Sequence, residues 1–77
     1  MSAATARVDP EAFRRALRER CLTGEDVRRE ARLSPSTLAK VYRGEPVTDS
    51  VFRRLVLELQ RHPVQPVAEE LIAREAS

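Results

Sequence analysis

The residues best suited to chemistry lie between Ser34 and Arg43, where small polar side chains precede basic ones. Ser36 and Thr37 can form hydrogen bonds with base edges, and the Thr37 methyl group can contact a thymine methyl group. Lys40, one helical turn later, can reach a guanine edge or a phosphate, and Arg43 is placed for a phosphate. A helix that enters the major groove of DNA needs this order, because small residues let its backbone approach the bases.

Two short helices separated by a tight turn are predicted over residues 23–44, the pattern of a helix-turn-helix. Thr23 is the expected N-cap of the first helix, Ser34 caps the second, and Gly44 ends it. The free amides at both helix starts favour phosphates. For Tyr42, packing of its ring beneath the fourth helix is an alternative to a phosphate contact. The expected base contacts are Pro35, Ser36, Thr37 and Lys40, and the expected phosphate contacts are Thr23, Gly24, Ser34, Tyr42 and Arg43.

Three further helices are expected to position this pair. The first follows the N-cap Asp9 and extends over residues 10–20, and the fourth follows the cap Thr48 and ends at His62, before Pro63. The fourth is expected to form the main wall of the core through Val51, Phe52, Leu55, Val56 and Leu59. The predicted organisation is a flexible arm over 1–8, a DNA-binding domain over 9–62, and a C-terminal helix over 63–77 for packing or dimerisation, with an apolar stripe of Val67, Leu71 and Ile72.

Length and composition favour one small helical domain. The chain has 77 residues, two glycines and three aromatic residues, so a sheet-rich fold lacks its turn residues and its preferred strand formers. Of 14 basic residues only Lys40 is a lysine, and arginine is the better ligand for phosphate and guanine. We therefore predict an all-α, compact five-helix fold.

Enzymatic function is not expected, because a single cysteine and a single histidine cannot form a cysteine–histidine or serine–histidine–aspartate site. The same count excludes a disulfide within the chain and a four-ligand structural zinc site, so neither a cofactor nor a metal is expected. Cys21 is expected to fill an apolar corner, and His62 to lie in solvent at a helix end. No stretch predicts a signal peptide or a membrane span, which predicts a cytoplasmic, nucleoid-associated protein without membrane partners.

The helix-turn-helix residues resemble the phage-repressor-like (Cro-like, XRE) family of DNA-binding domains. The resemblance is carried by Leu22-Thr23, Glu25-Asp26-Val27, Arg29, Ala31, Leu33-Ser34-Pro35-Ser36-Thr37-Leu38 and Gly44, and it extends over about Ala12 to Leu59 with the flanking helices. It implies a lambda-repressor-like fold and a prokaryotic or phage transcription regulator, usually a homodimer on a two-fold-related double-stranded operator. By position, Ser36, Thr37 and Lys40 match the base-contacting residues of the family.

Three residues depart from the family pattern. Gly24 stands where the family usually has glutamine, Arg28 where it has a small alanine, and Arg32 where it has a glycine in the left-handed conformation. Either the turn is slightly remodelled, or the Arg28 side chain lies along the helix pair and brings its head to the surface. The alternative function is a protein-interaction module, such as an antitoxin or a phage or plasmid accessory factor that binds a protein partner.

Overall fold

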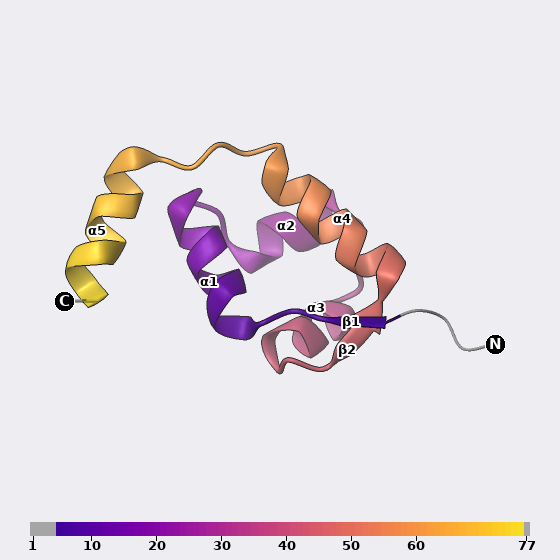
Figure 1. Cartoon of the computed structure of the whole chain (residues 1–77). Helices are drawn as coiled ribbons and strands as arrows, with labels where there is room; N and C mark the ends of the chain where they lie inside the picture. Colours follow the sequence, from indigo (N-terminus) through magenta and orange to yellow (C-terminus); the bar gives the residue numbers. More distant parts are fainter. Residues whose placement is uncertain (1–4, 77) are drawn as a thin grey trace.

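In this computed structural model, which describes residues 5–76 and side chains through residue 72, four of the five helices enclose a small core and the last helix lies beside the first (Figure 1). The molecule measures 45 × 24 × 18 Å. The prediction of five helices is confirmed for this part of the chain. The elements are β1 (Thr5–Arg7), α1 (Pro10–Glu19), α2 (Gly24–Glu30), α3 (Pro35–Tyr42), β2 (Pro46–Thr48), α4 (Asp49–Gln60) and α5 (Pro66–Ala76).

The small sheet corrects the prediction that the fold is all-α, and its first strand lies within residues 1–8, the predicted flexible arm. β1 pairs with β2 in an antiparallel register that places Ala6 opposite Val47. Val47 is buried in the core, which anchors β2, and the backbone of β1 then pairs with it. Residues 1–4 of the predicted arm lie outside the described residues.

Helix starts follow the capping residues predicted from the sequence. The Asp9 carboxylate accepts a hydrogen bond from the Glu11 amide, and the Ser34 and Thr48 hydroxyls each accept one from the amide three residues later. Thr23 forms a reciprocal pair with Asp26, in which each side chain accepts from the amide of the other. These bonds satisfy amides that have no partner within the helix.

The helices α1, α2 and α3 end with the same backbone geometry, although only α3 is followed by a glycine. After α1, α2 and α3 the chain turns through a residue with positive φ: Cys21 at 56°, Arg32 at 58° and Gly44 at 71°. In each case the amide of the following residue bonds to a carbonyl five residues earlier, at 2.9 Å, which is a Schellman cap. The prediction that Cys21 fills an apolar corner is wrong, because it is exposed at this capping position.

Replacing Arg32 by glycine is expected to raise the free energy of unfolding by up to about 1 kcal/mol. The left-handed conformation costs a non-glycine residue roughly 1–2 kcal/mol, and the added freedom of glycine in the unfolded chain offsets about half of the gain. Urea denaturation of Arg32→Gly measures the change. The reverse change at the cap that has a glycine, Gly44→Ala, is expected to lower the free energy of unfolding by about 1 kcal/mol. Stabilities unchanged in both variants would contradict this explanation of the turns.

The core lies between α1, α2, α3, β2 and α4. Leu55 of α4 is buried as predicted, and Phe13 and Leu17 of α1 are buried with it, but Phe52 is wrongly predicted as a wall residue, since it is 37% exposed. Glu58 is buried instead, at 4% exposure. The buried core residues are Phe13, Leu17, Val27, Ala31, Leu33, Val41, Val47 and Leu55.

The last helix, α5, packs beside α1 at one end of the molecule (Figure 1). Its predicted apolar stripe is divided: Ile72 is buried within the chain, whereas Val67 and Leu71 are 68% and 52% exposed. Ile72 is therefore not free for dimerisation, which corrects that part of the prediction. None of the helices in the described part of the chain is long and apolar enough to cross a membrane.

Candidate nucleic-acid interface

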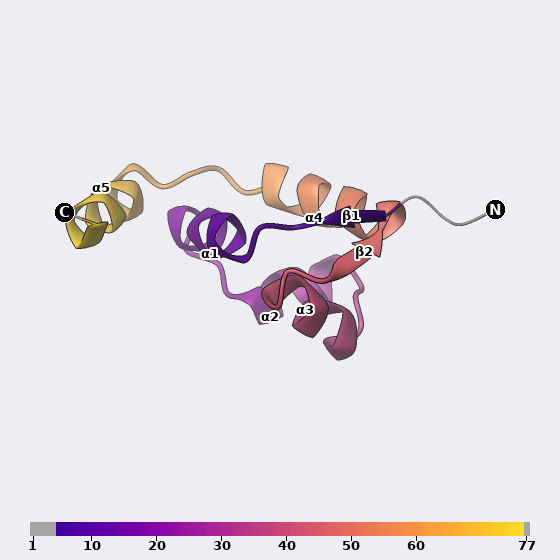
Figure 2. The same ribbon diagram turned by 60° about the horizontal axis from the view of Figure 1, so that its bottom comes forward.

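In Figure 2 the pair α2–α3 lies below α4, with α1 to one side, and α2 packs directly against α4. Val27 of α2, Leu33 of the turn and Val41 of α3 are all buried, so their packing sets the angle between the two helices. This arrangement leaves the outer surface of α3 uncovered by the other helices in the described residues.

Arg28 stabilises the turn between α2 and α3. Its Nη1 atom donates to the Leu33 carbonyl at 3.2 Å, and its guanidinium forms a two-pronged pair with Glu25. The hydrogen bond from Arg28 lowers the pKa of Glu25 below its ordinary value. Of the two possibilities left by the sequence, the first does not hold, since Arg32 keeps the positive φ of the missing glycine. The second holds in part, because the Arg28 side chain lies across the turn and is 21% exposed.

The first two turns of α3 hold the predicted base-contacting residues. Pro35, Ser36 and Lys40 are exposed, and Thr37 is half-buried. The Ser34 hydroxyl lies 2.8 Å from the Thr37 hydroxyl and 3.1 Å from the Ser36 hydroxyl. The three hydroxyls therefore form a connected polar surface at the start of the helix, where a base edge can replace one internal partner.

A small hollow of about 160 Å³ lies where α3 meets the strands. Thr37 and Lys40 line it from α3, and Thr5 and Thr48 line it from β1 and β2. The sequence did not predict that the two threonines would lie beside α3, because it gave no sign that residues 5–7 and 46–48 pair.

A larger open hollow of about 520 Å³ lies at the start of α2. It brings together Thr23, Gly24 and Tyr42, three of the five predicted phosphate contacts, and adds Arg14 and Arg18 from α1. The Arg14 guanidinium lies 5.2 Å from the centre of the Tyr42 ring, a cation–π contact. Arg14 and Arg18 were not predicted as phosphate contacts, although their spacing of four residues indicates that they share one face of a helix.

Gly24 has a packing reason that the sequence did not reveal. A Cβ atom at this position would lie 2.9 Å from Cζ of Tyr42 and closer still to its hydroxyl oxygen. The Tyr42 ring also packs edge-on against Phe13, with ring centres 5.5 Å apart. The Tyr42 ring is therefore packed, but against Phe13 of α1 and Gly24 of α2 and not beneath the fourth helix as the alternative interpretation expected, and Tyr42 lines the hollow.

Charges around the interface are partly paired. Arg43 forms an ion pair with Glu45, which raises the pKa of Arg43 and lowers that of Glu45. At the start of α2, a hydrogen bond from the Thr23 amide lowers the pKa of Asp26 and keeps it ionised. A phosphate at this helix start would meet that negative charge, so Arg14 and Arg18 are the residues that can attract it.

Comparison of the chain with protein-family models, with curated protein sequences and with solved structures found no match. The function must therefore be inferred from the residues of α1, α2 and α3. Their geometry combines exposed small polar groups on α3 with two arginines on the neighbouring α1.

Proposed function

We propose that the chain is a sequence-specific double-stranded DNA-binding regulator of the phage-repressor-like helix-turn-helix class, acting as a transcriptional repressor. The observation that carries the proposal is the uncovered first turn of α3, where Pro35 and Ser36 are exposed and Lys40 follows one turn later. Inserted into the major groove, this surface brings hydroxyl groups and one ammonium group to the base edges. Repression would follow from occupation of the operator.

We assign two distinct roles to the proposed contacts. Ser36, Thr37 and Lys40 contact bases, whereas Arg14 and Arg18 contact the phosphates next to the groove and fix the orientation of α3. Arg43 reaches a phosphate only by exchanging its Glu45 partner, so its contribution is smaller than that of Arg14 or Arg18.

A homodimer is the proposed functional state, because two half-sites about 34 Å apart require two copies of α3. Exposed Val67 and Leu71 on α5 are the residues that would meet the second copy. Burial of these apolar side chains would add stability to a chain with a small core.

Selection from a pool of random duplexes, at two salt concentrations, tests the proposal. A shared two-fold-related site is expected, with affinity that falls by orders of magnitude between roughly 50 and 200 mM salt as counterions are released. Failure to enrich any sequence, with weak binding abolished by modest salt, would exclude a sequence-specific regulator.

The second candidate function is a protein-interaction module, such as an antitoxin. It is favoured by the outer face of α4, where Phe52 and Leu57, the latter 54% exposed, line a hollow of about 320 Å³. Exposed apolar side chains that cluster in this way are typical of protein contacts. Under this hypothesis, Phe52→Ser would remove partner binding, whereas changes at Thr37 and Lys40 would leave it intact.

A further inference from the structure

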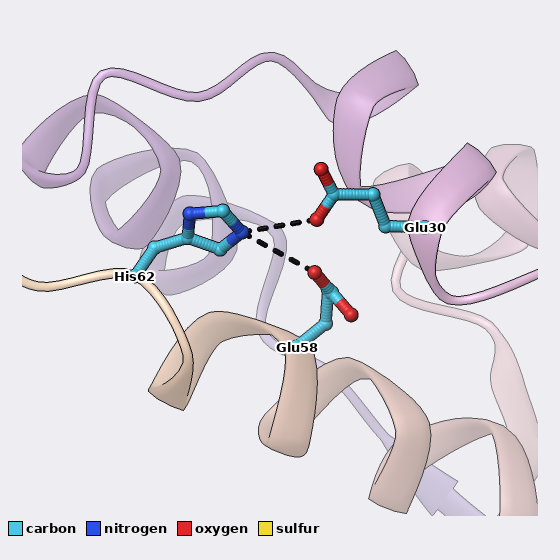
Figure 3. Close-up of side chains that lie close together, drawn as sticks. All are labelled: Glu30, Glu58 and His62. Atoms are coloured by element: carbon cyan, nitrogen blue, oxygen red, sulfur yellow. Dashed lines mark hydrogen bonds and ion pairs between the residues drawn. The ribbon is translucent and has the colours of Figure 1, made fainter.

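Three metal-ligating side chains meet at the junction of α2 and α4, and none of them is a proposed DNA contact. Glu30 is the last residue of α2, Glu58 lies in α4, and His62 lies in the turn after α4. The His62 Nε2 atom is 3.0 Å from Oε2 of Glu30 and 3.2 Å from Oε2 of Glu58 (Figure 3). His62 is therefore not a solvated helix end, as the sequence predicted, but bridges two carboxylates.

The spacing of these donor atoms suits one metal ion. Ligands bound at about 2.0–2.2 Å in tetrahedral or octahedral geometry lie about 2.9–3.5 Å from one another. One ligand atom from each of the three side chains can be chosen so that all lie within 4.8 Å of one another. Two of the three separations already have the values of bound neighbours, so the separation between the two carboxylates is the one that binding must set.

Burial and charge favour a cation at the same point. The Glu58 side chain is only 5% exposed, and its ion pair with Arg61, at 3.4 Å, involves an arginine that is 73% exposed. A buried carboxylate is costly unless it is closely paired, and a divalent ion would neutralise both Glu30 and Glu58. The Glu30 and His62 side chains are 47% and 30% exposed, which leaves room for entry of the ion and for bound water.

We propose that Glu30, Glu58 and His62 form a binding site for a divalent transition-metal ion of the zinc type, with water completing the coordination. Imidazole nitrogen and carboxylate oxygen are both ligands that zinc accepts, whereas calcium and magnesium prefer oxygen alone. The His62 ring must be neutral to bind, so the metal replaces the ring proton, which passes to solvent. The bound ion links the end of α2 to the end of α4. This proposal does not depend on DNA binding.

Titration of zinc chloride into the metal-free full chain tests the site directly. Because His62 is the only histidine, its imidazole NMR signals report this site without ambiguity. Saturable one-to-one binding, a shift of those signals and a rise in Tm of about 10 °C at roughly 100-fold excess over the Kd are expected. Unchanged His62 signals at millimolar zinc would overturn the proposal.

Matched variants separate this site from adventitious binding. Glu30→Gln and His62→Gln are each expected to weaken zinc binding about tenfold or more, since each removes one ligand. Glu45→Gln, which removes an exposed carboxylate elsewhere, and Cys21→Ser, which removes the only thiol, are expected to bind zinc like the original chain. Equal affinity in His62→Gln and the original chain, or loss of binding in Cys21→Ser, would refute the site.

Discussion

A double change of Thr37 to valine and Lys40 to glutamine is expected to weaken binding to the selected operator about 100-fold or more. Each lost base contact costs roughly 1–3 kcal/mol, and the two contacts act at neighbouring base pairs. Valine keeps the shape of threonine, and the Ser34 hydroxyl still accepts from the residue 37 amide, at 3.2 Å, so the helix cap survives. Fluorescence anisotropy with a labelled duplex, at one fixed salt concentration, measures the affinity.

Arg53→Gln is the matched control for the loss of one positive charge. Arg53 is exposed on α4, beside Phe52 and Leu57, away from α3. Its change is expected to weaken binding less than about threefold, because a remote charge acts only through the general field. An equal loss in both variants would show that binding is purely electrostatic, and retained selection in the double variant would exclude α3 as the base-contacting helix.

Much of the helical pattern was predictable because it is encoded locally. Asp9, Thr23, Ser34 and Thr48 each signal a helix start, and each forms the expected cap. A capping hydroxyl or carboxylate needs only the amides two or three residues ahead, so no distant part of the chain is involved.

Two helix ends were harder to predict, since their signal was not glycine. Cys21 and Arg32 accept the strained conformation because the apolar residue that follows each one, Leu22 and Leu33, packs on the core. That apolar residue after the cap is part of the Schellman motif and was a usable sign. The strain at the two caps is offset by packing elsewhere in the fold.

The remaining differences depend on contacts between distant segments. β1 and β2 are three residues each and about 40 positions apart, so no local pattern indicates that they pair. The bridge from His62 to Glu30 likewise spans 32 positions. The candidate interface shows the same division: the α3 residues follow from the sequence, whereas Arg14 and Arg18 join it only through the packing of α1.

Replacing Gly24 by alanine is expected to lower the free energy of unfolding by about 2 kcal/mol. The new Cβ atom would overlap the Tyr42 hydroxyl and crowd Cζ at 2.9 Å, and overpacking of this kind typically costs about 1–3 kcal/mol. Tyr42 cannot easily move aside, because Phe13 packs against its ring and Arg14 lies over it. The better helix propensity of alanine offsets up to about 1 kcal/mol. Urea denaturation of the purified variant measures the loss.

A double-mutant cycle with Tyr42→Phe identifies the cause. Without the hydroxyl group, Gly24→Ala is expected to cost at least about 1 kcal/mol less, since the closest overlap is gone. The same cost in both backgrounds would mean that another contact excludes a side chain at position 24.

Tyr42→Phe alone also separates packing from DNA recognition. If the Tyr42 hydroxyl donates to a phosphate, the DNA affinity of the variant falls by a similar factor for every duplex sequence, because phosphate contacts carry no sequence information. If it only packs, DNA affinity is unchanged.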